Sequence, residues 1–248
     1  MQNIPNSESI LIQDIDTESQ VRRVVEILEE DIAFGYMHPR ERLVEDELLL
    51  RFGLKRHVVR QVLAELEKIG LVERKKNFGA LVKSYSVKEV VDLYIVREIL
   101  ETNCARQIRL PVPAEKMETL ESIQKQHDTA VMESNLQVVF RMNIAFHKAL
   151  FSLSDNQALT ELIELAAQRT HVVRSLTIVV PQILEQSRQD HHQMIKALRT
   201  GDQDRLVELC RGHLLPSRDA YIAQHRRLEY STERTDAITQ SDNSSKIC

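Results

Sequence analysis

Glycine and proline are scarce in this chain, and their scarcity limits the folds that it can adopt. Only six residues of each kind occur among 248, less than half of the usual combined share of roughly 12%. All-β folds use both residues in many tight turns, so a sandwich or a barrel is disfavoured. Tryptophan is absent and aromatic residues make up 4%, so Leu, Ile, Val and Ala must form most of the core. The composition therefore predicts a mainly α-helical protein.

Cysteine usage and the apolar pattern exclude two further classes of protein. Cys104, Cys210 and Cys248 show no CxxC spacing and cannot build a disulfide framework, so we expect a reducing, cytoplasmic location. The first 20 residues contain no Lys or Arg and lack the apolar run of a signal peptide. No segment approaches the ~18 apolar residues that a membrane span needs, so no membrane partner is expected.

The net charge of −4 conceals a basic block near the start of the chain. Residues 51–83 contain nine Lys or Arg residues against three acidic ones, whereas the chain as a whole is mildly acidic. A basic block of this kind is typical of a module that binds a polyanion. Taken alone it is also compatible with a solvated protein surface.

The pattern of residues 20–85 predicts a small helical domain with a β-hairpin. Three helices are expected, each ending beside a glycine, over residues 21–34, 48–52 and 56–70. Two short apolar segments then flank a basic tip at residues 74–77, and Gly79 follows that tip. This order is the outline of a winged helix-turn-helix, and the preceding residues 1–19 are expected to be flexible.

The helix expected over residues 56–70 is the second helix of the helix-turn-helix. It presents hydrogen-bond donors at its start and on its outward face: Lys55, Arg56, His57, Arg60 and Gln61. An α-helix fits the major groove of DNA, where Arg bonds guanine and Gln bonds adenine. Lys75 and Lys76 in the hairpin are placed to contact phosphates, which adds sequence-independent affinity. The alternative is a three-helix domain whose surface charges serve protein contacts, but the positions of the charges favour DNA.

The run LVEDELLLRFGLKRHVVRQVLAELEKIGLVERKKNFGALV resembles the DNA-binding domain of GntR-type bacterial transcription regulators. The resemblance implies that Arg56 and Arg60 are the two arginines of the recognition helix. It also implies that Gly79 is the glycine of the wing and that Arg42, just before the run, is a weaker candidate for DNA contact.

The run departs from the family pattern at the start of the recognition helix. Lys55 stands where a Ser is usual, so the helix loses a side-chain N-cap, at a cost of roughly 1 kcal/mol. His57 and Val58 replace a Thr-Pro pair, and Asp46 stands where many relatives have Arg. The binding mode is expected to survive these changes, but the operator sequence does not follow from the family.

Residues 87–230 are predicted to form a second domain, an antiparallel α-helical bundle. Short connections at Pro111, Pro113 and Pro181 and at two polar turns separate the segments. The expected helices span residues 87–109, 114–134, 136–153, 157–178, 182–200 and 203–227. The polar tail, residues 231–248, has no periodicity and is expected to be disordered.

Polar residues interrupt the apolar stripes of three of these helices. Asn143 and His147 lie on the stripe of the third helix, His191 on that of the fifth and His213 on that of the sixth, whereas His192 is one position off and should face outward. Buried imidazoles need partners, and one metal ion would satisfy several at once. Neutral imidazole suits a divalent ion of the Zn, Ni or Fe class. The alternative, a metal-free cluster of core histidines, stays open.

The same region resembles the FCD domain, the C-terminal ligand-binding domain of the FadR-like branch of the GntR family. The matching segments are VREILE, NIAFHKAL followed by SDNQAL, DHHQMIKALRTGD and RGHL. The resemblance implies a divalent metal held by Asn143, His147, His191 and His213, with a small organic acid bound beside it. Asn143 stands where Asp is the commoner residue, which would make the site less negative.

Arg97 lies on an inward stripe, where a guanidinium is costly unless it is paired. One interpretation is an ion pair with Glu101, four residues further along the helix. The other, which the resemblance supports, is that Arg97 binds the carboxylate of the effector bidentately.

Together these patterns predict a transcriptional regulator and not an enzyme. A homodimer would bind double-stranded DNA at a pseudo-palindromic operator, and a small organic acid would modulate that binding. The rival hypothesis is a metalloenzyme acting on a small carboxylate, since three His residues and an open position can activate water. The stripes carry no clear general base, which argues against it.

Overall fold

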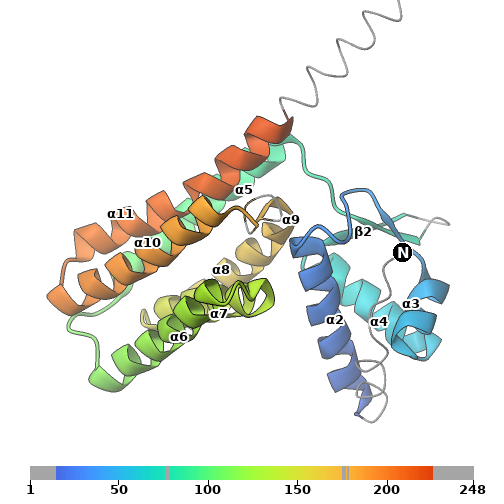
Figure 1. The fold of residues 1–248 in the computed structure, drawn as a ribbon, viewed down its shortest axis with the longest axis horizontal. Helices are drawn as coiled ribbons and strands as arrows, with labels where there is room; N and C mark the ends of the chain where they lie inside the picture. Colours follow the sequence, from blue (N-terminus) through green and yellow to red (C-terminus); the bar gives the residue numbers. More distant parts are fainter. Residues whose placement is uncertain (1–14, 76–78, 175–176, 178, 226–248) are drawn as a thin grey trace, which may run out of the picture.

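The chain folds into a small N-terminal unit that packs beside a larger helical bundle (Figure 1). A computed structural model describes residues 15–75, 79–174, 177 and 179–225. Helices dominate both units, and the only sheet within these residues has three short strands. The predicted mainly α fold is therefore confirmed. Every helix among the described residues is too short or too polar to cross a membrane.

The N-terminal unit consists of three helices and a small antiparallel sheet. The elements are α2 (Thr17–Ala33), β1 (Arg42–Leu43), α3 (Glu45–Phe52), α4 (Arg56–Lys68), β2 (Val72–Lys75) and β3 (Gly79–Val82). The Asp16 side chain caps α2, and Gly53 ends α3 in the left-handed conformation that glycine adopts without strain. In the sheet β3 lies between β1 and β2, so Leu81 pairs with both Arg42 and Glu73.

The C-terminal unit is a bundle in which each long helix packs against two or more others. Its elements are α5 (Val87–Gln107), α6 (Ala114–Met132), α7 (Leu136–Ser152), α8 (Gln157–Arg169), α9 (His171–Arg174), α10 (Pro181–Thr200) and α11 (Gln203–His213), with further helical residues at 215–225. α11 packs against α5 and α10, and α6 packs against α7 and α10. The bundle therefore combines pairs of consecutive helices with pairs that are far apart in sequence, such as α5 with α11 and α6 with α10.

Three local features differ from the predicted elements. The helix expected over 157–178 ends at Arg169, because Thr170 turns its hydroxyl back to the carbonyl of Ala167 at 2.6 Å and accepts a bond from Arg97. The helix expected over 203–227 is interrupted by a turn at Leu214. Strand β1 was not predicted, since two residues are too few to show an alternating pattern.

One apolar core runs from the N-terminal unit into the bundle. Its buried members include Leu28 and Leu66 from the first unit and Tyr94, Val173 and Tyr221 from the second. The Tyr221 hydroxyl donates to the backbone carbonyl of Tyr85 at 2.7 Å, and the Tyr85 hydroxyl donates to that of Gly70 at 3.0 Å. Helix α2 lies between α4 and α9 (Figure 1), so it contacts both the N-terminal helix α4 and the bundle.

Candidate nucleic-acid interface and metal centre

The outward face of α4 carries the residues that the sequence singled out for DNA. The five side chains are all exposed: Lys55, Arg56, His57, Arg60 and Gln61. The opposite face is buried because Val58, Val59 and Val62 pack into the core. Lys55 occupies the N-cap position without a capping side-chain bond, as expected from the missing Ser.

Two acidic residues at the start of α3 contact the arginines of α4. Asp46 lies 2.8 Å from Nη2 of Arg56, and Glu45 lies 3.3 Å from Nε of Arg60. Both arginine side chains are more than half exposed, and exposed ion pairs of this kind contribute only about 0–1 kcal/mol. Both arginines therefore remain at the surface, where a polyanion can reach them.

The wing brings Gly79 and Arg42 together. Gly79 has a φ of +92°, and a Cβ on it would lie 3.7 Å from Nε of Arg42. Arg42 and Lys75 are exposed, and Lys75 lies 3.2 Å from Glu73. Lys76 lies outside the described residues. The sheet therefore places basic side chains beside the face of α4. The groove between them is lined by Arg60, Arg74 and Lys75 together with the acidic Glu45 and Glu67.

Three histidines from three helices converge inside the bundle. His147 (α7), His191 (α10) and His213 (α11) each offer a ring nitrogen, and these nitrogens all lie within 4.8 Å of one another. Nε2 of His147 is 3.1 Å from Nε2 of His213 and 3.3 Å from Nε2 of His191. His191 is fully buried, whereas His192 is exposed and bonds Asp128, as the periodicity predicts.

The other ring nitrogens define which tautomers are present. Nδ1 of His213 lies 3.2 Å from the Asp190 carboxylate, which only accepts hydrogen bonds. Nδ1 of His191 lies 2.9 Å from Oε1 of Gln124, which also accepts. In neutral rings both protons therefore sit on Nδ1, and both Nε2 atoms present lone pairs.

The arrangement fits a divalent metal. With all three rings neutral, at most one proton, on Nε2 of His147, lies among the three facing nitrogens, so lone pairs would be left unsatisfied without a cation. Burial lowers the pKa of His147 and of His191 well below 6.5, which keeps both rings neutral, as metal ligands must be. Nitrogen donors of this type suit Zn²⁺, Ni²⁺ or Fe²⁺.

Asn143 lies one helical turn before His147 and is 6% exposed. With its amide oriented to suit its neighbours, Oδ1 accepts from Nη2 of Arg174 at 2.7 Å and from Nη1 at 3.2 Å. Asn143 is therefore engaged with a guanidinium, and its role as the fourth metal ligand stays a prediction.

A cavity of about 210 Å³ adjoins the histidine cluster and contains two arginines. Arg97 donates through Nε to Glu101 at 2.8 Å and through Nη1 to Thr170 at 3.0 Å, so the ion pair considered from the sequence is present. Arg174 has no carboxylate ion-pair partner among the described residues, and burial beside Arg97 lowers its pKa to about 10. Arg174 is thus the guanidinium better placed to receive an anion.

Sequence reasoning missed Arg174 and His127. Arg174 falls in the segment that was expected to continue a long helix, so nothing marked its side chain. His127 is 1% exposed, and both of its ring nitrogens lack a partner within the described part of the chain. Burial lowers its pKa to about 4, and its ring lies 5.2 Å from that of His191. Its place seven residues after Leu120, on the apolar stripe of α6, was the available signal.

A winged helix-turn-helix with an exposed basic recognition helix, joined to a helical bundle, defines a DNA-binding transcriptional regulator. Comparison with known families agrees. Residues 20–82 match the bacterial regulatory proteins of the gntR family, and residues 92–215 match the FCD domain. The chain belongs to the GntR family of regulators with a C-terminal FCD domain.

Related proteins are transcription regulators and not enzymes. The chain is 24% identical over 193 residues to the HTH-type transcriptional repressor RspR of Escherichia coli K12, covering 78% of this chain and 85% of that protein. It is 25% identical over 171 residues to the HTH-type regulator YdhC of Bacillus subtilis, covering 68% and 76%.

Two solved structures share the fold. A GntR regulator of Rhodococcus sp. RHA1 matches with a TM-score of 0.69 and 21% identity, over 83% of this chain and 98% of that one. McbR/YncC of E. coli matches with a TM-score of 0.73 and 16% identity, over 85% and 99%. The winged helix-turn-helix and the helical FCD bundle are thereby confirmed as the architecture.

Proposed function

We propose that this regulator binds a pseudo-palindromic operator as a homodimer and that a small organic acid, bound beside a divalent metal in the FCD domain, modulates that binding. The observation that carries the proposal is the convergence of three imidazoles beside a cavity lined by two arginines, the buried Arg97 and the half-buried Arg174. A bacterial regulator that acts on chromosomal DNA works in the cytoplasm.

Asn143, His147, His191 and His213 would hold the metal. When bound, the metal supplies a Lewis acid to which the oxygens of a chelating acid coordinate. Arg174 and Arg97 line the adjacent cavity and would bind the carboxylate. A hydroxy- or keto-acid satisfies both requirements, because one end of it can chelate while its charge meets a guanidinium.

The DNA-binding roles follow from the positions of the side chains. Arg56, Arg60 and Gln61 on α4 would bond base edges in the major groove, flanked by Lys55 and His57. Arg42, Gly79 and the wing lysines Lys75 and Lys76 would lie along the phosphate backbone.

Contacts between α9 and α2 connect the cavity to the DNA-binding unit. His171 lines the cavity and lies 2.9 Å through Nδ1 from Glu29 of α2. The next residue, Glu30, accepts hydrogen bonds from Arg141 and Gln137 of α7. An acid that shifts α9 would therefore move α2, against which α4 packs. Couplings of this kind are typically about 1–3 kcal/mol.

The proposed dimer is supported by an exposed apolar surface on α5 and α8. Ile95, Val96 and Ile99 on α5 and Leu162 on α8 are all about half exposed, although they are large and apolar. α5 and α8 pack side by side, and clustered exposed apolar residues mark interaction surfaces. A self-complementary surface would generate the two-fold symmetry that a pseudo-palindrome needs.

Operator binding in the presence of acid and metal tests the proposal. A duplex that the protein selects from random DNA is titrated with protein in four states, with and without metal and with and without a carboxylate from a screen. We expect at least one small hydroxy- or keto-acid to change the affinity, about 5- to 150-fold, only in the metal-loaded protein. Equal affinity in all four states across the screen would refute it.

A further inference from the structure

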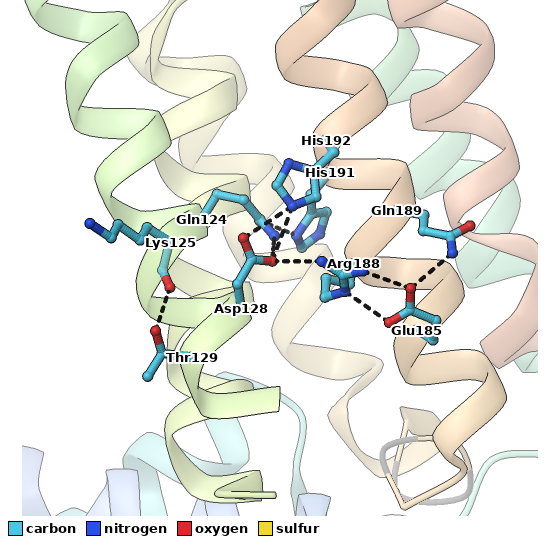
Figure 2. Close-up of polar contacts among 9 residues, drawn as sticks. All are labelled: Gln124, Lys125, Asp128, Thr129, Glu185, Arg188, Gln189, His191 and His192. Carbon is cyan, nitrogen blue, oxygen red and sulfur yellow. Dashed lines mark hydrogen bonds and ion pairs between the residues drawn. The ribbon is translucent and has the colours of Figure 1, made fainter. Parts of the chain in front are cut away.

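Helix α6 supplies no ligand to the proposed metal set, yet two of its polar side chains face the ligand-bearing helix α10. Gln124 and Asp128 are four residues apart, so both lie on the same face of α6. Gln124 is 1% exposed, which is unusual for an amide unless its hydrogen bonds are satisfied. Figure 2 shows both side chains pointing across to His191, His192 and Arg188 of α10.

The hydrogen bonds of these residues have only one consistent direction. The Asp128 carboxylate can only accept, so the group of Gln124 that lies 2.9 Å from it must be the amide Nε2. The amide oxygen of Gln124 then faces Nδ1 of His191, also at 2.9 Å, and that nitrogen must donate. The proton of His191 is thereby placed on Nδ1, on the side of Gln124 (Figure 2). Nε2 is left with a lone pair, 3.3 Å from Nε2 of His147.

Asp128 is itself fixed from α10. His192 lies 3.1 Å from both carboxylate oxygens, and Nη1 of Arg188 lies 3.4 Å from Oδ1. Arg188 is held in turn by Glu185, which accepts two hydrogen bonds of 2.8 Å from the guanidinium (Figure 2). The carboxylate that orients Gln124 therefore has little freedom to rotate.

The same arrangement, an acceptor for Nδ1 that another side chain fixes, occurs at a second histidine. Asp190 accepts from Nδ1 of His213 and is held by the amide of Gln186, four residues before it, at 2.8 Å. In contrast, Nδ1 of His147 has no partner within the described residues. Two of the three imidazoles are thus oriented by an acceptor that another side chain fixes, which is how metal-ligating histidines are held in other proteins.

We propose that Gln124 and Asp128 are positioning residues for the metal centre: Asp128 fixes the amide of Gln124, and Gln124 fixes His191 in the tautomer and orientation of a metal ligand. The inference rests on the proposed function, since it assigns a role toward the metal. Partners of this kind typically change metal affinity about 10- to 100-fold when they are removed.

Metal affinity of the full-length, untagged protein tests the role. Zn²⁺ binding is measured by competition with a chromophoric chelator for the wild type, Gln124→Met, Gln124→Glu and Asp128→Ala. Methionine keeps the volume and removes the acceptor, so we expect about a 10- to 100-fold loss for Gln124→Met. Glutamate keeps an acceptor for Nδ1 of His191 and should bind Zn²⁺ more tightly than the methionine variant. Asp128→Ala should lose affinity in the same direction, by a smaller factor.

The matched control is Gln126→Met, which alters the same residue type on the same helix. Gln126 is exposed and bonds only the carbonyl of Ser122 among the contacts described, so its variant should bind Zn²⁺ like the wild type. Equal Zn²⁺ affinity in Gln124→Met and Gln126→Met, with both proteins folded by circular dichroism, would overturn the proposal.

The tautomer itself is observable without metal. Long-range ¹H–¹⁵N spectra of the histidine rings distinguish a protonated Nδ1 from a protonated Nε2. We expect His191 to carry its proton on Nδ1 in metal-free wild type and to populate both tautomers in Gln124→Met. A wild-type protein that binds no Zn²⁺ would contradict the proposed function. A proton on Nε2 of His191 in the metal-free wild type would contradict the positioning by Gln124, whatever the metal result.

Discussion

At the scale of single residues, the interior of the bundle contains more imidazoles than its hydrogen bonds satisfy. Acceptors hold Nδ1 of His191 and of His213, but both nitrogens of His127 lack a partner among the described residues. An unsatisfied buried polar group costs about 1–3 kcal/mol. Buried without a partner, His127 therefore makes the stability of the metal-free domain sensitive to acid.

We predict that His127 makes the metal-free protein less stable as the pH falls. Its pKa is about 4 in the folded protein, chiefly through burial, against 6.5 when unfolded. Between these values the unfolded state binds more protons, so this contribution is present above pH 6.5 and is lost on approach to pH 4. His127→Leu should reduce the drop in unfolding free energy from pH 7 to pH 5 by about 2 kcal/mol.

Urea unfolding at both pH values measures this difference. The charged or titratable neighbours that face His127 are retained in both proteins: Asp128, Arg188, His192 and His213. Identical pH dependence in wild type and variant would show that His127 is protonated as readily in the folded state as in the unfolded state.

We also predict that the two arginines on the outward face of α4 carry sequence-specific binding. Arg56→Ala or Arg60→Ala should weaken operator binding about 5- to 150-fold, since a good base contact is worth about 1–3 kcal/mol. Lys68→Ala is the matched control, because Lys68 is also exposed on α4 but lies at its far end. Electrophoretic mobility shifts report the affinities, and unchanged binding in either arginine variant would refute the recognition-helix assignment.

At the scale of elements, the sequence predicts the helices and turns whose positions depend on residues close together in the chain. Glycines at the helix ends and the helical spacing of apolar residues predicted α3, α4 and the wing. Gly53 and Gly79 adopt the positive φ values that these turns require. At the break, Thr170 accepts a hydrogen bond from Arg97, 73 residues away, and no local pattern encodes that contact. Arg174 and Gln124 were missed for the same reason, because their roles depend on partners from other helices. The histidine cluster was predicted because each member interrupts an apolar stripe.

Helix α2 is the element through which the FCD domain would act on DNA binding, and Glu29 is the contact that tests it. Glu29→Gln removes the charge that faces His171 and should reduce the effect of the acid on operator affinity, by up to the full coupling of about 1–3 kcal/mol. Affinity of the acid-free protein for DNA should change less, since Glu29 lies away from α4's outward face. Glu26→Gln, which alters an exposed acid paired with Arg23, serves as the control. Full retention of the acid's effect in Glu29→Gln would exclude this route.

At the scale of the whole molecule, the two units share one apolar core. They are therefore packed against each other and are not joined only by a flexible linker. Tyr85 and Tyr221 join the wing, the start of α5 and the C-terminal helical residues. A second copy of the chain would then present its recognition helix at a fixed distance from the first, as a pseudo-palindromic operator requires.

We predict that Ile99→Glu abolishes the proposed dimer and leaves the protein monomeric. A carboxylate in an apolar interface would have to be desolvated without a partner, which is strongly unfavourable. Met132→Glu is the control, since Met132 is a large exposed apolar residue on α6 instead of α5. Sedimentation velocity gives the mass in solution, and a dimer that persists in Ile99→Glu would place the interface elsewhere.

His147, His191 and His213 are proposed to hold a metal ion, and the metal content of the purified protein shows whether they do. Full-length protein, purified without a His-tag and never exposed to a chelator, is analysed by inductively coupled plasma mass spectrometry. We expect roughly one equivalent of a divalent ion of the Zn, Ni or Fe class, falling to below about a tenth in His191→Ala, because the remaining ligands bind too weakly to survive purification. Less than about a tenth of an equivalent in the wild type would instead make the cluster a metal-free part of the core.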